Sequence, residues 1–246
     1  GLFFLLIVIP LAMVVRHSPE SMGIEPEGQN AVDATSSGVD STTLDFTVGE
    51  ALRTRTYWVL TLATTLRLTL SGALVVHAVE MIAQEGIGRE AAGFMIALMF
   101  LVSAPVRVVA GMMGVWFPIQ PLLSVGMIAG GLGLLSLLLL DGYTAAYLFV
   151  ILVGVEQGSS ALTWVTLGNF YGRKCFTTLL GLMGMFYNVG LLLSPIYAGW
   201  IADTHQGSYT VALASFVPLY AIAALLFLMM RKPTVPPQRK PILTPN

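Results

Sequence analysis

Long apolar runs, separated by short polar stretches, make up most of the chain after its first quarter. Each run is long enough to cross the roughly 30 Å apolar core of a bilayer as a helix. The six runs cover residues 57–83, 91–115, 119–140, 143–168, 178–202 and 209–230. The pattern therefore predicts an all-α integral membrane protein in which residues 57–230 form a bundle of six membrane-spanning helices.

A seventh apolar run, residues 1–15, is shorter than a full span and lacks the basic start of a signal peptide. We expect it to be the second half of a span that begins upstream. The six full spans would then follow a partial sixth span, as in the C-terminal half of a twelve-span transporter.

Polar segments flank the six spans. Residues 16–56 are rich in Ser, Thr, Asp and Gly in their middle, a composition that cannot bury an apolar core, and we expect a cytoplasmic loop. Thr47 and Glu50 have the spacing of a capping box, which predicts a short interfacial helix over about 48–56. Residues 231–246 are rich in proline and are predicted to form a cytoplasmic tail.

Composition narrows the functional classes. The 246 residues are 56% hydrophobic and only 10% charged, whereas soluble domains carry about 25% charged residues. The sequence has no basic patch with interleaved aromatic residues, so we expect no nucleic acid partner. Its single cysteine, Cys175, excludes an internal disulfide. It also has no metal-ligand spacing and no nucleophile–base motif, and we expect no metal, no cofactor and no enzymatic activity.

Basic residues indicate how the spans are oriented. If the end of run 1–15 lies on the cytoplasmic side, nine of the twelve Lys and Arg residues are cytoplasmic and only Arg89 is outside. The remaining two, Arg67 and Arg107, lie within spans. Cytoplasmic loops of membrane proteins carry such an excess of basic residues. We therefore expect a multi-pass protein whose C-terminus is cytoplasmic.

Three ionisable side chains lie deep inside the apolar runs, namely Arg67, Arg107 and Glu156. A charge at the bilayer centre costs about 2.5–3.5 kcal/mol on insertion scales, so such residues face a cavity or one another. A guanidinium matches a carboxylate in shape and charge, and we expect Arg107 to bind substrate rather than to snorkel to the headgroups. Glu156 is predicted either to carry a proton or to pair with Arg107 or Arg67. Arg67 is either that partner or a second substrate ligand.

Other polar residues share these spans. His77 and Glu80 lie on neighbouring positions of one helix face, and are predicted either to relay protons or to pack together, with the histidine hydrogen-bonded. Tyr187 and Asn188 either complete the substrate site or, for Asn188, bond across helices. Spans one, two, four and five carry all of these residues. We expect those four spans to line a cavity, and spans three and six to face lipid.

A weak internal match relates the second and fifth spans. Residues 105–115 and 195–203 each begin with a proline and continue to an Ala-Gly pair. Spans three apart correspond to each other in a three-plus-three inverted repeat. The match therefore predicts that arrangement.

Five stretches, taken in order, resemble the C-terminal half of a major facilitator superfamily transporter. They are residues 18–28 (SPESMGIEPEG), 45–58 (DFTVGEALRTRTYW), 77–92, 170–174 (FYGRK) and 194–209. Within that superfamily, the chain is most similar to the bacterial oxalate/formate-antiporter-like and monocarboxylate-transporter-like branch.

The resemblance implies alternating access about a central site, with proton coupling or anion exchange. It implies a small organic anion as substrate, Arg107 as its carboxylate ligand, the N-terminal half of the same transporter as partner, and the bacterial inner membrane as location. Residues 115–118 lack the charges usual after the eighth helix of the family, and the eleventh helix lacks the lysine of some dicarboxylate exchangers. A monocarboxylate is therefore favoured. Efflux of drug-like compounds and a non-transporting membrane sensor are the alternatives.

Overall fold

The computed structural model describes residues 46–172 and 174–234, and all regular structure within those ranges is helical. The elements are α2 (Val48–Arg53), α3 (Arg55–Ala83), α4 (Arg89–Trp116), α5 (Ile119–Leu139), α6 (Gly142–Ser159), α7 (Ala161–Tyr171), α8 (Phe176–Thr204) and α9 (Thr210–Met229). The predicted span 1–15 and most of the predicted loop and tail lie outside the described residues.

The prediction of six membrane-spanning helices is confirmed. Six segments are long and apolar enough to cross a membrane, with α6 and α7 together forming the fourth. Every observed end lies within three residues of the predicted end. Hydropathy locates these helices well because the thickness of a bilayer fixes the length of an apolar span.

The short helix α2 precedes the first span and is held by its capping box. The Thr47 side chain accepts a hydrogen bond from the Glu50 backbone N–H, and the Glu50 carboxylate accepts one from the Thr47 N–H at 2.9 Å. Thr54 then caps α3 by accepting from the N–H of Tyr57. This arrangement agrees with the predicted capping box, although α2 ends three residues earlier than expected.

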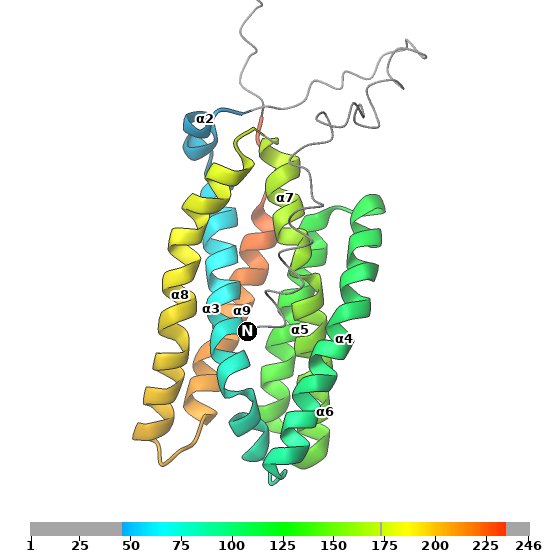
Figure 1. Cartoon of the computed structure of the whole chain (residues 1–246), viewed down its shortest axis with the longest axis vertical. Coiled ribbons are helices and arrows are strands. Elements are labelled where there is room, and N and C mark those ends of the chain that lie inside the picture. The colour runs from blue at the N-terminus through cyan, green and yellow to red at the C-terminus, as the bar shows by residue number, and fades with distance from the viewer. Residues whose placement is uncertain (1–45, 173, 235–246) are drawn as a thin grey trace, which may run out of the picture. The chain divides into compact units, whose positions relative to one another are not determined.

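The six spans run side by side, and their order in space differs from their order in the sequence (Figure 1). Helix α3 packs mainly against α8 and α9. Helix α5 packs mainly against α6 and α9, and α4 packs mainly against α6. Helices α4 and α8 are the least buried of the spans, whereas α5 is the most buried.

Glycines bring α6 into direct contact with the backbone of α4. A Cβ atom added at Gly154 would lie 2.9 Å from the carbonyl oxygen of Met99, and one added at Gly158 would lie 2.8 Å from that of Ser103. Small residues four apart let the backbones of membrane helices approach this closely. The two glycines therefore define the face of α6 that packs on α4.

The fourth span is interrupted at Ser160, which the apolar pattern does not predict. Ser159 Oγ donates a hydrogen bond to the carbonyl oxygen of Glu156 at 2.8 Å. The N–H of Ser160 does not donate to Glu156 O, four residues back, as in a regular α-helix. It donates to Gln157 O, three residues back, at 3.3 Å. A serine hydroxyl that competes for a backbone carbonyl in this way disturbs a helix locally. The interruption separates α6 from α7 one turn after Glu156.

Replacing Gly158 with alanine is expected to lower the melting temperature of the detergent-solubilised protein, because its methyl group would collide with the α4 backbone. Overpacking of this kind costs about 1–3 kcal/mol. Gly111→Ala is the matched control, because nothing lies within 4 Å of its added Cβ and both substitutions gain the same helix propensity. Equal melting temperatures for the two variants would contradict the close α4–α6 contact.

Candidate functional site

A buried ion pair joins α3 to α6. Nη1 of Arg67 lies 3.5 Å from Oε1 of Glu156, and the two side chains are only 3% and 0% exposed. Both residues are more than ten residues from the ends of their spans, so each lies about 18–21 Å from the first residue of its own span at 1.5 Å per residue. Of the two partners that the sequence leaves open for Glu156, Arg67 is the one that contacts it.

The pair does not satisfy its own hydrogen-bonding capacity. A charged N–H···O bond is usually about 2.7–2.9 Å long, shorter than this contact. Nε of Arg67 and both carboxylate oxygens of Glu156 have no hydrogen-bond partner among the described residues. Buried polar atoms are normally bonded, and exceptions call for a functional or structural reason. The site can therefore accept a proton on Glu156 or a polar ligand without first breaking a protein hydrogen bond.

The geometry of α6 aims Glu156 away from α4. Gly154 and Gly158 are two residues before and after Glu156, which places them about 200° around the helix from it. Because the glycine face packs on α4, the carboxylate points toward α3, α5 and α9. A second contact supports this placement, since Nε2 of Gln157 donates to Oγ of Ser71 in α3 at 2.7 Å.

Tyr220 of α9 is a member of the site that the sequence did not indicate. Its side chain is buried, its hydroxyl has no hydrogen-bond partner among the described residues, and its ring lies beside Glu156 at a glycine of α5. A Cβ atom at Gly130 would lie 2.5 Å from Cε1 of Tyr220 and 3.1 Å from Cγ of Glu156. The sequence signal is a tyrosine near the middle of a span that has no charged residue.

Arg107, the expected substrate ligand, lies on α4 outside the buried pair. It is exposed on the surface of the six-helix bundle, two residues after Pro105. No carboxylate within the two described ranges lies within ion-pair distance of its guanidinium. Its role as an anion ligand stays a prediction.

Tyr187 and Asn188 lie on α8 and do not contact the buried pair directly through any described hydrogen bond. The Tyr187 ring packs near that of Trp164, with centroids 6.0 Å apart. Nδ2 of Asn188 donates to Gly184 O within its own helix at 2.8 Å. This bond stays within α8, and the expected bond of Asn188 across helices stays a prediction.

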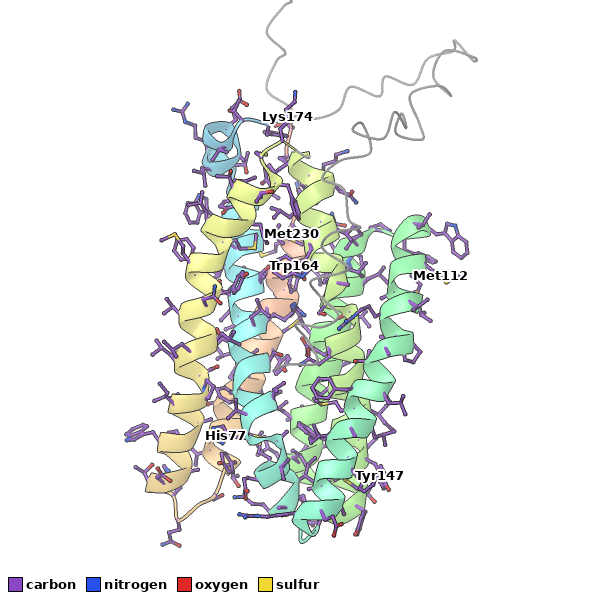
Figure 2. The ribbon with its side chains drawn as sticks, viewed as in Figure 1. His77, Met112, Tyr147, Trp164, Lys174 and Met230 are labelled. Atoms are coloured by element: carbon purple, nitrogen blue, oxygen red, sulfur yellow. The ribbon has the colours of Figure 1, made fainter. Side chains whose placement is uncertain are left out.

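His77 joins three elements near the end of the bundle opposite α2 (Figure 2). Its Nε2 lies 3.0 Å from the carbonyl oxygen of Pro195, and its Nδ1 lies 2.9 Å from the hydroxyl of Tyr209. A carbonyl only accepts, so Nε2 carries the proton and Nδ1 accepts from the tyrosine. His77 is therefore hydrogen-bonded, as expected, whereas the Glu80 carboxylate pairs with Arg89 at 3.0 Å.

Tyr209 lies in the turn before α9, and its hydroxyl is held in the protonated form. Burial, followed by the negative charges of Glu80 and Asp203, raises the pKa of Tyr209. A protonated hydroxyl is what the bond to Nδ1 of His77 requires. The contacts of His77 with Pro195 and Tyr209 are therefore neutral hydrogen bonds, while the ion pair of Glu80 lies at the surface.

No family model matches the chain, and no curated protein matches it. In the described part of the chain, no group of three His, Cys, Asp or Glu side chains is placed to hold a metal ion. Functional argument therefore rests on the geometry of the charged residues.

Arg67 and Glu156 are expected to behave as one unit in a double-mutant cycle. Arg67→Gln or Glu156→Gln alone leaves a buried charge without its partner and should lower the free energy of unfolding by about 3–5 kcal/mol. Replacing both residues should recover most of that loss. Thermal or denaturant unfolding of the four proteins in detergent measures the coupling.

The exposed pair of Glu80 and Arg89 is the control for this cycle, since its side chains are 44% and 77% exposed. Its coupling is expected to stay below about 1 kcal/mol. Additive effects of the Arg67 and Glu156 substitutions would contradict a functional unit at the buried pair.

Proposed function

We propose that the chain forms the C-terminal six-helix half of a secondary transporter of the major facilitator type, which moves small organic anions such as monocarboxylates by alternating access. The observation that carries the proposal is the Arg67–Glu156 pair, two charges held out of water inside six apolar helices. Ionisable residues at such depth mark ion or substrate pathways in membrane proteins.

The pattern of helix contacts supports a three-plus-three repeat. Dividing the spans into α3–α5 and α6–α9 makes α3 correspond to α6 with α7, α4 to α8, and α5 to α9. Exchanging the two triplets converts the α3–α8 contact into the α6–α4 contact and leaves the α5–α9 contact in place. Inverted repeats of this kind place the substrate site near the bilayer midplane, the depth at which the buried pair lies.

The two intramembrane arginines have different tasks in this proposal. Arg67 is held by Glu156, whereas the exposed Arg107 offers a guanidinium to the carboxylate of a substrate between the two halves of the transporter. A proton that binds Glu156 removes the negative charge facing Arg67. The attraction between α3 and α6 then weakens, and the change in charge couples proton movement to the rearrangement of the helices.

Efflux of apolar, drug-like compounds is the second candidate, and one observation favours it. A groove of about 820 Å³ lies between α3 and α8 at the α2 end, and its lining includes Trp58, Leu62, Met185 and Phe186. Pockets of this size with apolar and aromatic walls suit drug-sized ligands. Arg107 does not line this groove, so in that case it has no part in binding the compound.

Arg107→Ala is expected to reduce uptake of labelled monocarboxylates at least about tenfold, because a hydrogen bond to a charged group contributes about 1.5–3 kcal/mol. Uptake is measured with the full-length protein in proteoliposomes. Val108→Ala changes the neighbouring exposed side chain and should leave uptake unchanged. Full uptake by Arg107→Ala, or no carboxylate uptake by the unaltered protein, would refute the carboxylate site and favour efflux.

The double variant Arg67→Gln/Glu156→Gln tests coupling separately from substrate binding. It is expected to lose the stimulation of uptake by an inward proton gradient while carboxylate exchange in the absence of a gradient persists. Both activities are compared in the same proteoliposomes, with the melting temperature as a check on folding. A double variant that still responds fully to the gradient would assign proton coupling to other residues.

A further inference from the structure

A second basic site lies at the α2 end of the bundle, between α3 and α9. Arg55 is the first residue of α3, Arg231 follows the end of α9, and both line one pocket of about 560 Å³. Oγ1 of Thr56 donates to the carbonyl oxygen of Arg231 at 2.9 Å, which fixes the two helix ends relative to each other. The other lining residues are apolar: Val59, Leu228, Met229 and Met230.

The positive charge of this pocket is not neutralised by the residues that the structure describes. Both arginines are exposed, and no described carboxylate lies within 4.0 Å of either guanidinium. Met230 of the pocket lies toward the α2 end, and His77 lies toward the other (Figure 2). The pocket is thus remote from the polar contacts of His77.

Charge and apolar surface follow each other along the helix axis in this pocket. Arg55 lies at the start of α3 and Arg231 just past the end of α9. This is the level at which a spanning helix leaves the apolar core. Val59 and Leu228 are about one turn deeper, about 4.5–6 Å at 1.5 Å per residue, and Leu228 is 51% exposed. A ligand that fits both levels has an anionic head and an apolar chain.

We propose that this pocket binds an anionic phospholipid, with its phosphate between Arg55 and Arg231 and one acyl chain along Val59 and Leu228. Guanidinium groups bind phosphate through paired, charge-assisted hydrogen bonds. Basic pockets between the ends of membrane helices recognise acidic headgroups in the same way. The proposal does not depend on transport, because it uses none of the residues of the buried pair.

Native mass spectrometry of the full-length protein, delipidated and titrated with dioleoylphosphatidylglycerol, tests the site. The unaltered protein is expected to bind this lipid at least about tenfold more tightly than dioleoylphosphatidylcholine. Arg55→Gln/Arg231→Gln should weaken phosphatidylglycerol binding about thirtyfold. Arg53→Gln at the same end and Arg89→Gln at the opposite end do not line the pocket and should leave binding unchanged.

Leu228→Asn keeps both arginines and places a polar group on the acyl path, so it should also weaken phosphatidylglycerol binding. This exposed position decides the question if the arginine double variant does not fold. The melting temperature is also measured with inorganic phosphate at matched ionic strength, which tests whether the headgroup without its acyl chains is enough for binding. Unchanged lipid binding in the double variant or in Leu228→Asn would overturn the proposal. It would also be overturned if phosphate raised the melting temperature as much as the lipid does.

Discussion

The attraction between one buried guanidinium and one buried carboxylate constrains the rest of this structure. Taking two such charges out of water carries a penalty of several kcal/mol per ion, which only close opposite charge can offset. The side chains of Arg67 and Glu156 must therefore stay within reach of each other, and they link α3 to α6 although the backbones of these two helices do not pack closely. The glycine at position 130 leaves room for Glu156 beside Tyr220, so two further helices, α5 and α9, are arranged around these two side chains.

The charged residues fall into three environments with different physical consequences. The Arg67–Glu156 pair is buried inside the bundle, and Arg107 is exposed on the surface of α4. The pair of Glu80 and Arg89 lies at the surface of one end. Only the first environment is shielded from solvent by the surrounding helices, so only there does a change in protonation alter the force between helices strongly. An exposed guanidinium can still recognise an anion that brings its own charge and leaves with it.

Sequence reasoning recovered the spans and the capping box because both depend on local rules, the apolar length of a helix and the spacing of Thr47 from Glu50. It could not choose the partner of Glu156, because α3 and α6 meet only through the spatial order of the helices, which hydropathy does not encode. The bond between His77 and Tyr209 was missed for the same reason. Tyr220 escaped notice because a single hydroxyl hardly changes the apolar character of its span.

Gly154 and Gly158 of α6 lie against the backbone of α4, and this contact limits how the two helices can move relative to each other. The nearest parts of α4 at this contact are main-chain carbonyl oxygens and the short, stiff side chains of Val102 and Val106, so no long flexible side chain separates the two helices there. If α6 tilts at Glu156, α4 must therefore tilt with it, and the two helices move as one rigid unit. Arg107 lies one turn beyond this contact on α4. In the proposed mechanism, protonation of Glu156 therefore affects Arg107 through a rigid movement of α4.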